Sequence, residues 1–124
     1  MHDRKRRILC AESHKDIANL IVLMLGQKGY EVKTTSTVTE TLELAGREQF
    51  DLFIVNDNYV DGDSMELLSE LRRQHVETPV LLFSLDSASQ YRDFGQDVKA
   101  HQFLNKTGDF AALVQTIDHL LQAS

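Results

Sequence analysis

The chain alternates short apolar runs with amphipathic segments five times, and this alternation restricts its fold more than any other feature. The apolar runs have the length of strands, and the segments between them place apolar residues three and four apart, as helices do. Strands are expected at 7–12, 31–36, 51–56, 78–84 and 101–105, and helices at 14–28, 37–50, 63–75, 87–98 and 109–122. Such alternation predicts an α/β fold, with parallel strands joined by right-handed crossovers and helices on both faces.

Size and composition predict one soluble globular domain that spans residues 1–124, with its core at about 7–122. The formal net charge of −6 argues against a nucleic-acid binder, although residues 4–7 are all basic. The longest apolar run, 20–25, is too short to span a membrane, and no signal segment opens the chain. We therefore expect a cytoplasmic protein without membrane contact, in which the single Cys10 is a small core residue.

Polar residues follow the predicted strands at the edge where open parallel sheets carry their functional crevice. Carboxylates, an amide, hydroxyls and an ammonium group would converge there. These residues are Glu12, Ser13, Asn56, Asp57, Ser84 and Lys106. Polar residues at strand ends are common loop starts, so only their joint placement is informative.

Three separated segments resemble the receiver domain of bacterial two-component response regulators. They are "DLFIVNDNYVDGDSMELL" at 51–68, "PVLLFS" at 79–84 and "AHQFLNK" at 100–106, and the resemblance extends over residues 7–122. It implies a flavodoxin-like (βα)5 fold: a doubly wound parallel sheet in three layers, with strand order 2-1-3-4-5. It also implies that helices 14–28 and 109–122 share one face and the other three helices share the opposite face.

The resemblance also indicates which residue occupies the position of the family's phosphoacceptor aspartate. In the family this aspartate lies four residues before a proline and seven before the aspartate of the following turn. Counting back from Val60, from Asp63 and from Glu66 gives position 56 each time, and position 56 is asparagine. Asp57 comes one residue too late.

In a working receiver, the resemblance implies, the aspartate attacks a phosphohistidine and becomes an acyl phosphate, a form of covalent catalysis by a carboxylate. The hydroxyl after the fourth strand and the lysine after the fifth contact the phosphoryl group. Ser84 and Lys106 match these positions. Asn56 does not match the nucleophile, because an amide oxygen carries no full charge and the nitrogen lone pair is delocalised.

The family's Mg²⁺ site would fall on Glu12, Ser13 and Asn58, and the sequence predicts that it is vestigial. Glu12 keeps one acid of the family's pair, but Ser13 replaces the second acid and Asn56 removes a third carboxylate. Mg²⁺ prefers carboxylate oxygens. We therefore expect weak or absent Mg²⁺ binding and no other cofactor.

The leading hypothesis is a degenerate receiver that signals by protein–protein interaction, without phosphorylation at the usual site and without enzymatic activity. By resemblance its output face comprises residues 87–98, 101–105 and 109–122, with Phe103 as the switch aromatic; a core role for Phe103 has equal weight. Partners are signalling proteins, and a homodimer is a further option.

Two alternatives stay open from the residues alone. In the first, Asp57 is a true phosphoacceptor with Mg²⁺, which needs a one-residue bulge or a rotated strand end that turns it toward Lys106. Alternation along a strand buried on both faces does not exclude this. In the second, the chain is a small-ligand-binding or enzymatic flavodoxin-like domain, although it has neither a G-x-G-x-x-G nor a phosphate-loop motif.

Overall fold

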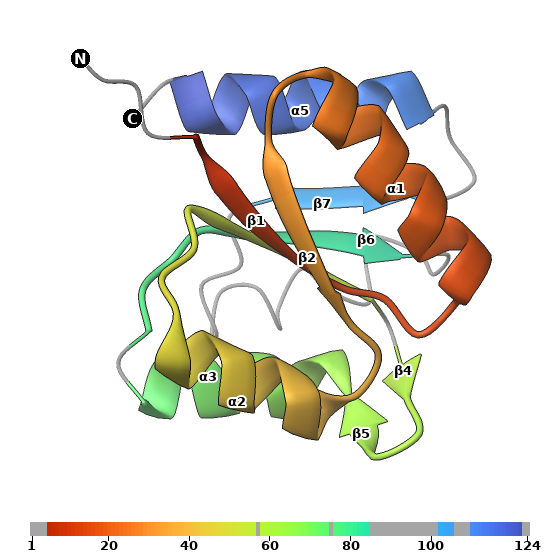
Figure 1. Ribbon diagram of the computed structural model, residues 1–124. Helices are drawn as coiled ribbons and strands as arrows, with labels where there is room; N and C mark the ends of the chain where they lie inside the picture. Colours follow the sequence, from red (N-terminus) through yellow and green to blue (C-terminus); the bar gives the residue numbers. More distant parts are fainter. Residues whose placement is uncertain (1–4, 57, 75, 85–101, 106–109, 123–124) are drawn as a thin grey trace.

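The computed structural model describes residues 5–56, 58–74, 76–84, 102–105 and 110–122 (Figure 1). The predicted helix at 87–98, together with Asp57 and Lys106, lies outside the described residues. Within the described part of the chain, no helix is long and apolar enough to cross a membrane.

A parallel five-stranded sheet forms the centre of the fold, in the order β2-β1-β3-β6-β7. Its strands are β1 (Arg7–Ala11), β2 (Glu31–Thr35), β3 (Leu52–Val55), β6 (Val80–Ser84) and β7 (Gln102–Asn105). Every neighbouring pair of these strands is parallel. In chain order they are the five predicted strands, so the predicted order 2-1-3-4-5 is confirmed.

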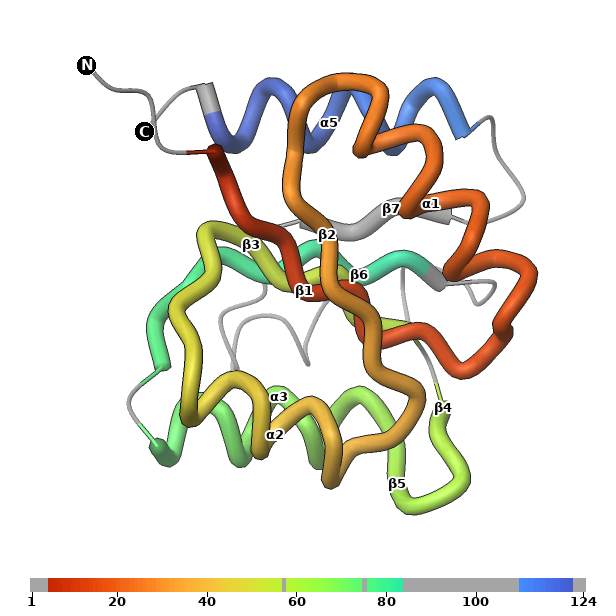
Figure 2. Tube along the Cα trace, viewed as in Figure 1, coloured from red at the N-terminus to blue at the C-terminus, as the bar shows by residue number. Residues whose placement is uncertain are grey.

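Helices cover both faces of this sheet, as predicted for a doubly wound fold (Figures 1 and 2). Helices α1 (Lys15–Gln27) and α5 (Phe110–Gln122) lie on one face, and α2 (Val38–Arg47) and α3 (Ser64–Arg73) lie on the other. Along β1, Ile8 and Cys10 belong to the core beneath α1 and α5, whereas Leu9 and Ala11 belong to the core beneath α2 and α3. Both faces of the strand are thus buried, which explains its unbroken apolar run, and Cys10 is a core residue as predicted.

Two apolar helix residues are exposed, although their spacing from other apolar residues would also fit a buried helix face. Leu20 is 39% and Met65 is 53% exposed. In α1 the buried positions are Ala18, Ile21 and Leu25, three and four residues apart, and Leu20 lies beside this stripe. Helix α3 begins at Ser64, itself buried. Met65, one residue further on, therefore points away from the face that α3 buries.

The N-termini of α2 and α3 are capped by side chains of the residue types that N-caps favour. The Asp63 carboxylate accepts a hydrogen bond from the backbone N–H of Glu66 (2.9 Å), and Glu66 bonds back to the N–H of Asp63, which completes a capping box. Thr37 caps α2 by accepting from the N–H of Glu40. The Glu40 carboxylate, however, accepts from the N–H and hydroxyl of Ser36.

A small antiparallel hairpin between β3 and α3 was not predicted. It consists of β4 (Asn58–Tyr59) and β5 (Gly62–Asp63). Figure 1 shows it at the edge of the molecule, beside the start of α2. Two-residue strands carry too few residues for a periodic pattern, so the sequence gives no sign of them.

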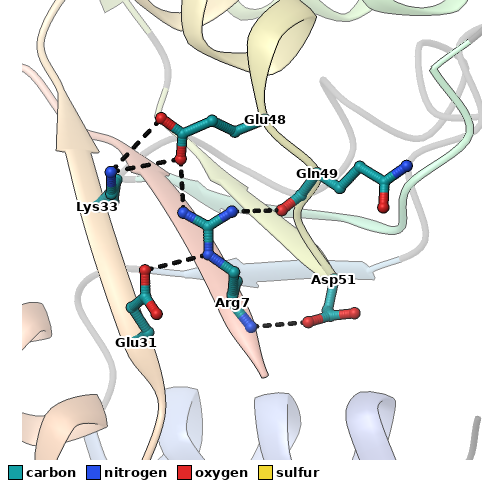
Figure 3. Close-up of polar contacts among 6 residues, drawn as sticks. All are labelled: Arg7, Glu31, Lys33, Glu48, Gln49 and Asp51. Carbon is teal, nitrogen blue, oxygen red and sulfur yellow. Dashed lines mark hydrogen bonds and ion pairs between the residues drawn. The ribbon is translucent and has the colours of Figure 1, made fainter. Parts of the chain in front are cut away.

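At the opposite end of the strands, a polar cluster around Arg7 ties β1, β2 and the α2–β3 connection together (Figure 3). The Arg7 guanidinium donates to Glu31 (3.1 Å), to Glu48 (2.5 Å) and to the carbonyl oxygen of Gln49 (2.9 Å). Its carbon lies 4.8 Å from the centre of the Phe50 ring. Glu48 holds the pKa of Arg7 above its ordinary value, chiefly through the hydrogen bond. The basic residue at position 7 is therefore structural.

Candidate functional site

The candidate site lies where β1 and β3 end, at the carboxyl edge of the sheet. Both strands are buried and lie side by side, with Ala11 opposite Val55. The residues that follow them are therefore brought together: Glu12 and Ser13 from β1, and Asn56 from β3. Glu12 is 4% and Asn56 is 9% exposed, so both polar side chains are buried and need partners inside the protein.

Asn56 supplies the donor that these buried groups require. Its amide nitrogen donates to the Glu12 carboxylate (3.1 Å) and to the Ser13 hydroxyl oxygen (3.2 Å). A carboxylate accepts hydrogen bonds only, which fixes the orientation of the Asn56 amide with its NH₂ group toward Glu12. The amide at position 56 thus provides the positive end of a dipole where the family would have a second negative charge.

Two further contacts extend the network. The same oxygen of Glu12 accepts from the backbone N–H of His14 (2.9 Å), and the Ser13 hydroxyl donates to the carbonyl oxygen of Asn58 (3.3 Å). Each of the three predicted metal ligands, Glu12, Ser13 and Asn58, is therefore engaged with another group of the protein.

Tyr59 completes the site and was not identified from the sequence. Its hydroxyl donates to the carbonyl oxygen of Ala11 (2.7 Å) and accepts from the backbone N–H of Asn56 (2.9 Å), so it bridges the ends of β1 and β3. Tyr59 is 7% exposed. The available signal was an aromatic residue three positions after residue 56, in a turn rich in Asp and Gly. A tyrosine that is buried there needs a hydrogen-bond partner for its hydroxyl.

Asp61 was missed as well, because its partners lie on another element. Its carboxylate accepts from the backbone N–H groups of Val38 (2.8 Å) and Thr39 (3.0 Å) and from the Thr39 hydroxyl (2.8 Å). The backbone hydrogen bond from Thr39 is the largest cause that lowers the pKa of Asp61 below its ordinary value. Asp61 is exposed, and its carboxylate nevertheless caps α2 from a distant loop.

The donor set does not fit Mg²⁺. Glu12 offers one carboxylate, while Ser13 and Asn58 offer a hydroxyl and a carbonyl oxygen that already bond to each other. The NH₂ group of Asn56 points toward the same space, and a metal ion would repel it. Mg²⁺ demands near-octahedral oxygen ligands and is held chiefly by carboxylates. In the portion of the chain that is described, no group of three or more His, Cys, Asp or Glu residues could hold a metal ion.

The other predicted site residues are placed only in part. Ser84 ends β6 and is paired in register with Asn105, and Phe103 lies in β7 opposite Leu82. Both strands therefore end at the same edge of the sheet as Glu12 and Asn56. Asp57 and Lys106 fall outside the described residues, so which side chain faces Lys106 stays a prediction.

Comparisons with known proteins agree with this architecture. The family model of the response regulator receiver domain matches residues 8–118. Among curated relatives, the response regulator protein PilR of Pseudomonas aeruginosa is 29% identical over 91% of this chain and 25% of its own length. The transcriptional activator protein PfeR of the same species is 32% identical over 94% of this chain and 38% of its own length. The chain thus spans between a quarter and two fifths of these relatives.

Solved structures show the same fold. The Francisella response regulator 1452 receiver domain superposes with a TM-score of 0.89 at 22% identity, covering 96% of this chain and 98% of that one. The Thermotoga maritima response regulator TrrA, solved in complex with Mg²⁺-BeF, gives a TM-score of 0.83 at 24% identity, covering 94% and 99%. With the family model matched across most of its length, the chain belongs to the response regulator receiver domains of two-component systems.

Proposed function

We propose that this receiver domain signals through contacts with partner proteins and takes up no phosphoryl group at position 56. The observation that carries the proposal is the pair of hydrogen bonds from the Asn56 amide to Glu12 and Ser13. These bonds stabilise a neutral residue at the position where the family's chemistry requires a carboxylate.

The chemistry of an amide supports the same conclusion. An acyl phosphate forms when a carboxylate oxygen attacks phosphorus, and the attacking oxygen must carry available electron density. The Asn56 side-chain oxygen is neutral, and the NH₂ group of the same side chain donates to the Glu12 carboxylate. Neither atom is a useful nucleophile, so phosphoryl transfer to this residue is not part of the proposed function, and the domain is not an enzyme.

A metal ion is likewise not part of the proposed function. TrrA was solved with Mg²⁺-BeF, but in this chain Glu12 accepts from the N–H of His14 and the Ser13 hydroxyl donates to the carbonyl oxygen of Asn58. Partners are proteins of a signalling pathway, contacted through the face formed by residues 87–98, β7 and α5. A homodimer through this face is included in the proposal, and nucleic acid is not.

Intact-mass spectrometry after incubation with acetyl phosphate and Mg²⁺ tests the proposal. The mass of the protein is expected to stay unchanged. A gain of one phosphoryl group that persists in Asn56→Ala but disappears in Asp57→Asn would contradict it and establish Asp57 as the acceptor.

The variant with both Ser13→Asp and Asn56→Asp is the positive control for the metal site. It returns two carboxylates beside Glu12, and we expect it to bind Mg²⁺ more tightly than the unmodified protein, as measured by titration calorimetry. Equal Mg²⁺ affinity of the two proteins would contradict the assignment of this crevice.

A further inference from the structure

The β4–β5 hairpin is bonded to three different elements. Tyr59 bridges the ends of β1 and β3 through its hydroxyl, and the Ser13 hydroxyl donates to the carbonyl oxygen of Asn58. At the other end of the hairpin, Asp61 receives the hydrogen bonds from Val38 and Thr39. Only a few residues of chain separate the contact with position 56 from the contact with α2.

The Asp61 carboxylate bonds N–H groups at the start of α2 that have no partner within the helix. The first N–H groups of a helix have no partner within it, and they form its positive end. Val38 and Thr39 are the first two residues of α2. One carboxylate therefore satisfies both N–H groups and also bonds the Thr39 hydroxyl, in hydrogen bonds strengthened by its charge. The usual N-cap, Thr37, bonds to a different group, the N–H of Glu40.

Packing holds the same two elements together. Val38 and Tyr59 are both buried members of the core beneath α2 and α3. A Cβ atom added to Gly62 would come within 3.1 Å of the Val38 side chain, so the hairpin lies against α2 as closely as a glycine allows. A short segment that is bonded at both ends and packed against its neighbour transmits a displacement, whereas a free loop absorbs it.

We propose that the β4–β5 hairpin couples the position-56 site to the first turn of α2, with Tyr59 and Asp61 as its two attachment points. A change at the end of β3 then alters the N-terminus of α2, and contact of a partner with α2 alters the crevice in return, since coupling between two sites is reciprocal. The exposed side of α2 is then a second surface whose structure depends on the state of the position-56 site. The coupling runs through the backbone N–H of residue 56 and does not depend on whether that residue accepts a phosphoryl group.

Amide hydrogen exchange, measured residue by residue by NMR, tests the coupling. Asp61→Asn places an NH₂ group where one of the accepting oxygens was, so exchange of the Val38 and Thr39 amides should accelerate about tenfold. The decisive measurement is made at the other end of the hairpin. The backbone N–H of Asn56, which donates to the Tyr59 hydroxyl, should also exchange at least about threefold faster. Tyr59→Phe removes only the hydroxyl and tests the coupling from the other end of the hairpin. It should accelerate exchange of the backbone amides of Val38 and Thr39.

Thr37→Ala is the matched control, because it weakens the same helix end without touching the hairpin. It should accelerate exchange of the Glu40 amide and leave the Asn56 amide at its original rate. If Asp61→Asn, like Thr37→Ala, leaves the exchange rate of the Asn56 backbone N–H unchanged, Asp61 stabilises only the end of α2 and the coupling is refuted. Asp61 is exposed, so this pair decides the question even where Tyr59→Phe does not fold.

Discussion

At position 56 the difference between an amide and a carboxylate is a difference in hydrogen-bonding direction as well as in charge. The Asn56 NH₂ group donates to Glu12, whereas an aspartate in the same place would present an oxygen to that carboxylate. Two carboxylates buried at such a distance disfavour each other's ionised forms. The asparagine therefore stabilises this edge of the sheet.

The variant Asn56→Asp tests this at the level of a single residue. In metal-free buffer it should lower the free energy of unfolding by about 1 to 3 kcal/mol, because it removes a buried donor and adds a like charge. Chemical denaturation measures the change. The compensating variant, Asn56→Asp with Glu12→Gln, restores one donor and one carboxylate and should recover part of the loss. Equal stability of Asn56→Asp and the unmodified protein would show that the hydrogen bonds to Glu12 and Ser13 do not contribute.

At the scale of elements, long periodic segments could be predicted and short ones could not. The five sheet strands and four of the helices appear where apolar spacing placed them, with ends shifted by a few residues. The hairpin and the Asp61 cap were missed, since the cap joins residues 22 and 23 positions apart. A local pattern contains no information about such a contact. Leu20 and Met65 show the same limit, because spacing alone does not define which of two adjacent stripes faces the sheet.

Two glycines are expected to respond oppositely to replacement by alanine, because one is closely packed and the other lies in open space within a helix. Gly62 has φ +158°, and its added Cβ would press on Val38, whereas Gly46 in α2 has nothing within 4 Å. Gly62→Ala should therefore lower the free energy of unfolding by about 1 kcal/mol or more. Gly46→Ala should raise it by about 0.5 to 1 kcal/mol, because alanine loses less backbone entropy in a helix. Thermal unfolding of both variants measures the contrast, and a loss of stability in both would contradict it.

For the molecule as a whole, the order of strands followed from the resemblance and the alternation of elements, and the structure confirms it. The site was predictable to the extent that strand ends converge: Glu12, Ser13, Asn56 and Asn58 do meet. What the sequence could not give was the hydrogen-bond arrangement among them. That arrangement depends on which atoms face each other, and it shows that the residues at the family's ligand positions bond to one another.

This hydrogen-bond network leads to a prediction about the stability of the whole domain in Mg²⁺. An ion that binds only the folded state stabilises it by RT ln(1 + [L]/Kd), about 1 kcal/mol when the ion is at about five times its dissociation constant. For a domain of this size such a gain raises the melting temperature by about 3 to 5 °C. Here the Glu12 charge already faces the Asn56 NH₂ group and the His14 N–H, so little electrostatic strain remains for an ion to relieve.

Millimolar Mg²⁺ should therefore leave the melting temperature within about a degree of its metal-free value. Asn56→Asp should make the melting temperature rise with Mg²⁺, because the second carboxylate creates both the strain and the ligand. Differential scanning calorimetry of both proteins, with and without the ion, gives the comparison, and Ca²⁺ at equal concentration controls for ionic strength and divalent charge. A clear rise in the unmodified protein that Glu12→Gln abolishes would mean that a working metal site survives around Glu12, and that the Asn56 amide turns away from it when the ion binds.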